Sequence, residues 1–264
     1  MGTSEAGTFV ATLRVLVNKG VRYSTVIDVG SADGHFFLHL YAMGLFPGAV
    51  PLNIDANDLY EDSLRAIKAA VGGDFQIVAI ADREGETELT TAAHPYWSSL
   101  HPQNHSYWAR INNLAATARS VPTTTLDSLC KRLRAVPPYL VKLDVQGLEQ
   151  AALRGATKVL KDTHVLICET DMDDFQGINR IMAENDFLLY DVTDMNRLAD
   201  GTLGWFYATY VNGQLAHLRP QEFWDKNHNS AIVNAQVQRR ALILKQNAEI
   251  IAHIQRQKAS TKKY

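Results

Sequence analysis

Residues 26–34 of the chain read VIDVGSADG, and this stretch decides the predicted fold. A β-branched apolar run ends at Val29, and two glycines then turn the chain into a segment with helical periodicity. Glycine at such a turn permits backbone conformations that other residues avoid, and it lets a ligand approach the main chain. The helix that follows presents free N–H groups and a positive dipole end. We therefore expect a ligand-binding strand–turn–helix unit.

Short apolar runs and longer helical segments alternate along most of the chain, which is typical of a mainly parallel sheet covered by helices. The predicted strands are Thr25–Val29, Val50–Ile54, Phe75–Ile80, Leu140–Val145 and Val165–Glu169. The predicted helices cover residues 34–44, 58–71, 126–134, 147–160 and 175–186. Two later runs, Phe187–Val192 and Leu203–Val211, predict an antiparallel pair that closes the sheet. The expected fold is a doubly wound, Rossmann-like α/β domain.

The end of the chain differs from this domain, which we expect to span residues 1–215 and to be followed by a helical extension over 216–264. From about Ser230, apolar residues recur at helical spacing and form one stripe. The stripe consists of Val233, Val237, Ala241, Leu244, Ala248 and Ile251. Three interpretations stay open: a long helix packed on its own domain, a homo-oligomer formed through this helix, or a basic surface for an anionic partner.

The composition is that of a folded protein, with 46% hydrophobic and 20% charged residues and a formal net charge of −2. This balance gives no global case for a nucleic-acid partner. No run reaches the length of a membrane span, and the first residues lack the pattern of a signal peptide. Cys130 and Cys168 stand far apart without metal-ligand spacing, as is usual in a reducing compartment. A cytoplasmic location is therefore expected.

The glycine spacing of the turn predicts the kind of cofactor. A nicotinamide-binding turn follows G-x-G-x-x-G and fits a pyrophosphate, whereas this turn follows G-x-x-x-G with Asp28 and Asp33 beside it. Two carboxylates repel a pyrophosphate but suit a ligand with an amino group and a sulfonium. The turn favours S-adenosylmethionine (SAM), and a nicotinamide-dependent oxidoreductase is the alternative. The candidate SAM-binding residues of the turn are Asp28, Gly30, Ser31, Ala32, Asp33 and Gly34.

Acids also follow the next two predicted strands. Asp55, with Ala56 beside it, stands where doubly wound folds place a carboxylate on ribose hydroxyls; capping of the following helix is the alternative. Asp82, preceded by Ala81, could accept a hydrogen bond from an adenine amine, or it could be a plain turn residue. We include all four residues among the candidates for SAM binding.

The run LVKLDVQGLE (residues 140–149) brings charges into a strand that is otherwise typical of the core. Lys142 and Asp144 fall on one face of it because side chains alternate along a strand. A buried charge is costly unless it is paired, so a structural pair between Lys142 and an acid is one interpretation. The other is a ligand-binding cluster at the carboxyl ends of the strands, where open α/β sheets bind ligands. The next strand ends at Glu169, so a further acid stands at this edge.

These motifs together resemble the FkbM family of SAM-dependent methyltransferases. That family shows D-V-G-A-x-x-G, then V-x-x-x-T-L-D, then K-x-D-V-E-G-x-E, then G-A-x-x-x-L and a strand that ends in Glu. The counterparts here are residues 28–34, 121–127 and 142–149, then Gly155 to Leu160, and Glu169. The resemblance covers about residues 20–190 in conserved order and spacing. Two departures are Ser31 in place of Ala and Gln146 in place of Glu.

The resemblance implies a class I SAM methyltransferase, and a sugar, glycoside or other small-molecule hydroxyl is the preferred acceptor. An alcohol is a weak nucleophile that needs a base or a metal. The implied catalytic residues are Asp144, Glu169 and Lys142, and Asp144 is also a candidate for SAM binding. The two acids would act as a base or as ligands of a divalent ion, for which carboxylate oxygens favour Mg²⁺ over Zn²⁺.

The stretch 94–108 is rich in aromatic residues and histidine, and it predicts a lid over the acceptor with His94 as a second candidate base. Alternatively, these aromatics only pack onto the domain. The neutral side chain of Gln146 keeps a further alternative open, in which the chain is an inactive scaffold that acts through its C-terminal helix.

Overall fold

The structure is a computed structural model that describes residues 7–91, 117–218, 237–249 and 251. The chain divides into two compact units, Met1–Leu218 and Arg219–Tyr264. In the second unit, residues 237–249 and 251 are helical, which confirms the predicted C-terminal helix. Val237, Leu244 and Ile251 are exposed on it. Within the described ranges, no helix is long and apolar enough to cross a membrane.

The first unit is built on a seven-stranded sheet of order β3-β2-β1-β7-β8-β10-β9. In that order the strands are Asp74–Ile77, Val50–Asp55, Thr25–Val29, Tyr139–Leu143, Thr163–Asp171, Trp205–Asn212 and Phe187–Thr193. β10 runs antiparallel to both of its neighbours, β8 and β9, and the other neighbouring pairs of this sheet are parallel. The structure thus confirms the mainly parallel α/β fold and the antiparallel closing pair.

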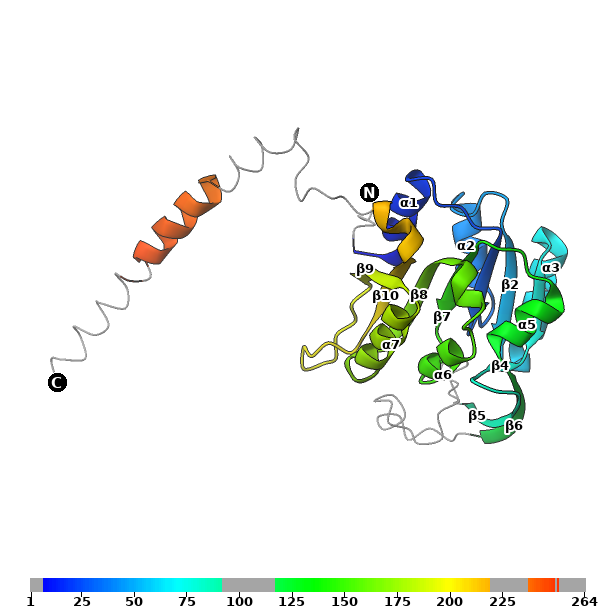
Figure 1. Cartoon of the computed structure of the whole chain (residues 1–264). Coiled ribbons are helices and arrows are strands. Elements are labelled where there is room, and N and C mark those ends of the chain that lie inside the picture. Colours follow the sequence, from blue (N-terminus) through cyan, green and yellow to red (C-terminus); the bar gives the residue numbers. More distant parts are fainter. Residues whose placement is uncertain (1–6, 92–116, 219–236, 250, 252–264) are drawn as a thin grey trace. The chain divides into compact units, whose positions relative to one another are not determined.

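Helices cover both faces of this sheet (Figure 1). The α-helices are α1 (Phe9–Asn18), α2 (His35–Ala42), α3 (Glu61–Val71), α5 (Leu126–Leu133), α6 (Glu149–Arg154) and α7 (Met172–Glu184). Short 3₁₀ turns are η1 (Asp58–Tyr60), η3 (Val159–Asp162) and η4 (Gly213–Leu218). The side chains of α1 and α2 join one buried cluster, and those of α5, α6 and α7 join another on the opposite face.

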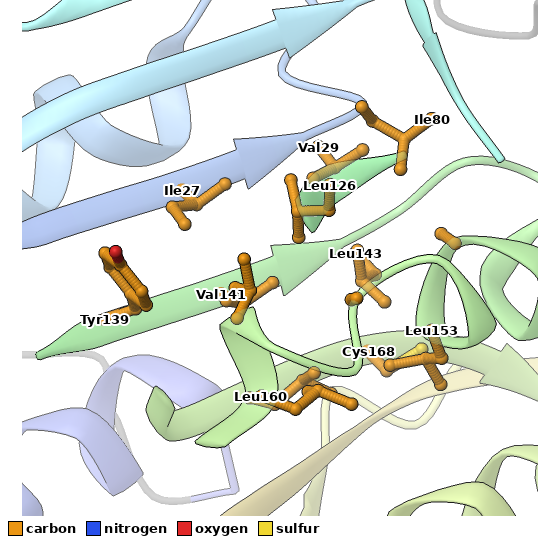
Figure 2. Packing of buried hydrophobic residues seen from close by; sticks show 14 of the residues in the cluster. Ile27, Val29, Ile80, Leu126, Tyr139, Val141, Leu143, Leu153, Leu160 and Cys168 are labelled. Carbon is orange, nitrogen blue, oxygen red and sulfur yellow. The ribbon is translucent and has the colours of Figure 1, made fainter. Parts of the chain in front are cut away.

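The core alternates along each strand because successive side chains point to opposite faces. Ile27 and Val29 of β1 pack with Val141 and Leu143 of β7 on the face of α5 and α6, as Figure 2 shows. The intervening position of β1, Asp28, therefore points to the face of α1 and α2. The same alternation places the charged residues of β1 and β7 on one side of the sheet.

The chain reverses direction across the sheet between β1 and β7. From β1 it proceeds outward to β2 and β3, and it then returns to β7 on the other side of β1. Val29 at the end of β1 is in register with both Ile54 and Leu143, so the three strands finish together. An open α/β sheet has its ligand crevice at such a switch point, beyond the carboxyl ends of the strands.

A second, three-stranded sheet of order β4-β6-β5 was not predicted. It consists of β4 (Ala79–Ile80), β5 (Gly85–Thr91) and β6 (Thr117–Thr124). The predicted single strand Phe75–Ile80 is wrong at its centre, because the chain leaves the main sheet after Ile77 and pairs Ala79 with Thr123.

The predicted helix over residues 147–160 is divided into α6 and η3. Gly155 lies between them, and a Cβ there would overlap the carbonyl oxygen of Ala81, so the turn packs closely on the end of β4. The Asp127 carboxylate accepts hydrogen bonds from the N–H groups of Lys158 and Val159 at 2.9 Å. This capping starts η3 in place of a continued helix.

Candidate active site

The glycine turn after β1 lies directly against the backbone at the end of the neighbouring strand, β7. Gly30 has φ +76°, and a Cβ there would overlap the carbonyl oxygen of Asp144. Gly34 has φ +79°, and its Cβ would collide with Ile67 of α3. Gly30 is required by conformation and by space, because the obstructing atom belongs to the backbone, whereas Gly34 is required mainly by its left-handed conformation. The turn is thereby fixed beside the residue that follows β7.

Asp55, at the end of β2, holds the turn from the other side. Its Oδ2 accepts a hydrogen bond from Ala32 N–H at 2.8 Å, and its Oδ1 accepts one from Asn57 N–H at 2.8 Å. Burial raises the pKa of Asp55, while these two backbone bonds oppose that rise. Each carboxylate oxygen retains a further lone pair.

The other polar residues of the turn have different surroundings. Asp33 Oδ1 accepts a hydrogen bond from His35 N–H at 3.2 Å and lies 2.8 Å from its Nδ1, so Asp33 contacts the first residue of α2. The Ser31 hydroxyl is buried and has no hydrogen-bond partner among the residues that the structure describes. A buried polar atom without a partner is costly and suits a site that receives a polar ligand.

Lys142 joins the turn to the carboxylates of the sheet. Its Nζ lies 3.3 Å from Asp28 Oδ1 and 3.3 Å from Asp144 Oδ2, and it donates a hydrogen bond to Gly30 O at 3.2 Å. The ammonium group also lies 5.6 Å from the centre of the Phe36 ring, within reach of a cation–π contact. The buried charge of Lys142 is therefore paired on both sides.

Asp144 and Glu169 form a carboxyl pair. Asp144 follows the end of β7, and Glu169 lies within β8. The amide of Gln146 donates to Asp144 Oδ1 at 2.9 Å and to Glu169 Oε2 at 2.8 Å. The hydroxyl of Tyr207, on β10, donates to Asp144 Oδ2 at 3.1 Å. Tyr207 is opposite Glu169 in the register of β10 and β8, which explains how an antiparallel strand reaches this site.

The two carboxyls differ in ionisation. Burial raises the pKa of Glu169 to about 9, and the negative charge of Asp144 acts in the same direction. Burial also opposes ionisation of Asp144, but Lys142 and the hydrogen bonds from Glu169 and Gln146 hold the pKa of Asp144 below its ordinary value. At neutral pH, Asp144 is therefore ionised and Glu169 carries a proton. Burial raises the pKa of Asp28, although Lys142 acts against that rise.

The region that contains this site matches a known protein family. Residues 28–189 match the methyltransferase FkbM domain. The chain belongs to the FkbM methyltransferase family. This confirms the resemblance found in the sequence motifs, and the matched region includes the turn, Lys142, Asp144 and Glu169.

Several solved structures are similar to this chain at low sequence identity. An FkbM methyltransferase from Methylobacillus flagellatus KT is 14% identical with a TM-score of 0.44, and the match covers 73% of this chain but only 45% of that one. An O-methyltransferase from Bacillus cereus in complex with SAH is 13% identical with a TM-score of 0.43, covering 80% and 83% of the two chains. TomG from Streptomyces achromogenes is 13% identical with a TM-score of 0.42, covering 81% and 82%. No curated protein matched in a sequence search.

Other candidate residues of this FkbM-family chain lie at the margin of the site or outside it. Ala56 is buried beside β4, and the Ala81 N–H donates to Thr124 O at 2.9 Å. Asp82 is exposed in the turn after β4. His94 and the stretch 94–108 lie outside the described residues, so the predicted lid and its histidine stay predictions.

The structure does not support the Mg²⁺ site that the sequence left open at Asp144 and Glu169. Among the described residues, no group of three or more His, Cys, Asp or Glu side chains is placed to hold a metal ion. The predicted ligands Asp144 and Glu169 are adjacent, but the Gln146 amide donates to both of them. Lys142 further places a positive charge 3.3 Å from Asp144 Oδ2. The side chains present do not fit Mg²⁺ at this position.

Two residues at the site of this FkbM-family chain, Tyr207 and Phe36, were not predicted from the sequence. Tyr207 belongs to the closing strand pair, and its contact with Asp144 depends on a β8–β10 register that no local pattern reports. Phe36 is typical of an amphipathic helix core, and it packs with Phe9 and Phe46 as well as below Lys142.

Proposed function

We propose that this chain is a SAM-dependent methyltransferase that methylates a hydroxyl of a sugar, glycoside or other small molecule. The observation that carries the proposal is the contact between the glycine turn and Asp144. The turn of β1 and the carboxyl pair of Asp144 and Glu169 lie together at the switch point of the sheet, and Gly30 packs on the Asp144 backbone. A cofactor held by the turn would therefore lie next to the carboxyl pair.

The residues around the turn fit SAM. The backbone from Gly30 to Gly34 would hold its methionine part, and the buried, unpartnered Ser31 hydroxyl would serve it as a polar contact. The free lone pairs of Asp55 would accept from the ribose hydroxyls, and Ala56, Ala81 and Asp82 would line the adenine side. When bound, SAM supplies an electrophilic methyl group on a positively charged sulfur.

Asp144 would orient the acceptor and receive its proton. Lys142 and Tyr207 fix the Asp144 carboxylate on its Oδ2 side, and the Asp144 side chain keeps 20% of its surface exposed. A hydroxyl that donates to this carboxylate is held for in-line attack, which is the main requirement of methyl transfer. Because the pKa of Asp144 is low, the proton moves to it only as the new C–O bond forms and the hydroxyl becomes acidic.

Glu169 and Asp28 would have supporting roles. Protonated Glu169 donates to Asp144 and thereby keeps a second negative charge out of the site at neutral pH. Asp28 is fully buried and contacts Lys142, so it would act on the site by holding that ammonium group. The turn and the carboxyl pair are coupled through Lys142.

The proposal is tested by the chemistry of the acceptor. The purified chain is incubated with SAM and with matched acceptors that carry a hydroxyl, an amine or a hydrogen at the same position of a sugar or glycoside. Release of S-adenosylhomocysteine with the hydroxyl compounds only supports O-methylation. Release with the amines alone would show an N-methyltransferase. That result would contradict the assigned hydroxyl acceptor, but SAM would remain the assigned cofactor.

A scaffold that acts through the C-terminal helix is the second candidate function. The observation that favours it is the exposure of Val237, Leu244 and Ile251 on that helix. A folded chain that binds neither SAM nor its demethylated product would support the scaffold over the enzyme.

A further inference from the structure

Gln146 bridges the carboxyl pair through a single nitrogen. Its Nε2 lies 2.9 Å from Asp144 Oδ1 and 2.8 Å from Glu169 Oε2. An amide NH₂ group has two hydrogens, so it donates one to each carboxyl. Asp144 follows the end of β7 and Glu169 lies in β8, so the amide connects the loop after β7 to the neighbouring strand.

The backbone that presents Gln146 is unusual for a residue with a side chain. Gln146 has φ +54°, in the left-handed region, and Gly147 follows with φ +107°. The Glu149 carboxylate braces this loop, because it accepts hydrogen bonds from the N–H groups of Val145 and Gly147 at 3.0 Å. A left-handed non-glycine residue at a binding site persists only when its surroundings enforce it. The loop is therefore built to aim the amide between the two carboxyls.

The NH₂ group of Gln146 places partial positive charge between two carboxyl oxygens. A divalent cation would bind at the same kind of position. Mg²⁺ is commonly held by one or two carboxylates and several waters, and Ca²⁺ by a larger set of oxygens. The amide nitrogen here occupies the space between Asp144 Oδ1 and Glu169 Oε2, and Lys142 is adjacent to Asp144 Oδ2. The amide therefore leaves a cation without a place between these two oxygens, whereas Lys142 lies at the other oxygen of Asp144.

We propose that the Gln146 amide takes the place of a bridging cation: it is a positioning residue that holds Asp144 and Glu169 together and keeps divalent ions out of the site. This geometry stands without any assumption about the substrate. Its consequence for catalysis rests on the proposed function, in which Asp144 is oriented by Gln146, Lys142 and Tyr207. The reaction would then proceed without a divalent ion.

The test measures Mn²⁺ binding to the full chain by electron paramagnetic resonance, because this readout requires neither SAM nor an acceptor. Gln146→Glu adds a third carboxylate at the position of the amide. Gln146→Gly removes the amide, leaves space for a hydrated ion, and suits the left-handed backbone. Gln150→Glu is the matched control, since the Gln150 amide also donates to an acid, Asp174 Oδ1 at 2.8 Å, but it bridges no pair.

The expected result is a gain of one bound Mn²⁺ in Gln146→Glu, with a dissociation constant on the order of 10⁻⁴ to 10⁻³ M, as in weak carboxylate sites. The wild-type chain and Gln150→Glu should show no such ion, and adding Asp144→Asn to Gln146→Glu should abolish it. Should Gln146→Glu fail to fold, as judged by circular dichroism, a gain of Mn²⁺ in Gln146→Gly decides in favour of the proposal.

Two outcomes overturn the proposal. One is a bound Mn²⁺ in the wild-type chain that Asp144→Asn removes, because the amide would then not exclude cations. The other is an absence of binding in every folded Gln146 variant, because the amide would then not occupy a cation position. Neither outcome depends on methyl transfer, so the failure of this proposal and that of the proposed function can be told apart.

Discussion

At the scale of single residues, the site depends on a buried lysine between two carboxylates. Lys142 contacts Asp28 and Asp144 at 3.3 Å each and also reaches the carbonyl oxygen of Gly30. Its charge is the main reason that Asp144 stays ionised in spite of burial. The ionised carboxylate is the group to which we assign the acceptor proton.

Replacing this carboxylate tests its role. Asp144→Asn should lower turnover by about 10²- to 10⁴-fold, the usual contribution of a positioned base. SAM affinity should stay close to that of the wild type, because the turn and Asp55 are unchanged. Steady-state kinetics and calorimetry measure the two quantities. Asp127→Asn, which changes a structural acid of α5, is the control, and normal turnover of Asp144→Asn would remove this residue from the mechanism.

Gly30 is predicted to be irreplaceable for reasons of space as well as conformation. Gly30→Ala should unfold at a clearly lower temperature and lose SAM binding, because its Cβ overlaps the Asp144 carbonyl oxygen. Gly44→Ala is the matched control: Gly44 has φ +73° but nothing lies within 4 Å of a Cβ there. The control should lose only about 1 kcal/mol of unfolding free energy from backbone strain. Equal losses in the two variants would contradict the close approach.

The proton on Glu169 predicts a pH dependence of stability. Its pKa is raised to about 9 in the folded chain, against about 4.3 for glutamate in an unfolded chain. Between these values the folded state binds the extra proton, so the free energy of unfolding falls as the pH rises toward 9. Glu169→Gln cannot lose this proton and should show a smaller fall between pH 6 and pH 8.5 in urea unfolding. An identical fall in both proteins would show that Glu169 is ionised at neutral pH.

At the scale of elements, the carboxyl ends of β1, β2, β7 and β8 could be predicted from the sequence, because each apolar run ends in or near an acid. The alternation of side chains also placed Lys142 and Asp144 on one face. The second sheet could not be predicted: β6 contains polar residues and Pro122, and its pairing with β5 is non-local. The break at Val78 lies inside a continuous apolar run, so no local signal marks the change of sheet.

The loop between β7 and α6 is predicted to depend on Glu149. Glu149→Ala should reduce the free energy of unfolding by about 2–3 kcal/mol, because the N–H groups of Val145 and Gly147 lose a buried acceptor. Gln150→Ala, the neighbouring change on the same helix, removes a single hydrogen bond to Asp174 and should reduce it by about 1 kcal/mol. Urea unfolding measures both. A smaller loss for Glu149→Ala than for Gln150→Ala would show that the brace is not needed.

At the scale of the whole molecule, every described residue of the site belongs to the unit Met1–Leu218. The sequence predicted both the sheet and a separate C-terminal helix, because periodicity reports such elements well. It could not predict how Tyr207 approaches Asp144, since that contact arises only from the complete strand order. The apolar residues of the C-terminal helix are exposed. Packing on its own domain, homo-oligomer formation and binding of an anionic partner all stay proposals for this helix.

This division predicts that the C-terminal unit is not required for cofactor binding. A chain that ends at Leu218 should fold and bind SAM with the affinity of the full chain, because none of the turn or carboxyl residues is removed. Calorimetry on the two forms makes the comparison. A large loss of affinity in a folded, shortened chain would mean that residues after Leu218 complete the site.

The most direct test of the central claim is calorimetric titration of the purified full chain with SAM, S-adenosylhomocysteine and NAD, with and without Mg²⁺. We expect binding of SAM and S-adenosylhomocysteine in the micromolar range, no response to NAD, and no change on adding Mg²⁺. Binding of NAD alone, or silence toward SAM and its product in a folded sample, would contradict it.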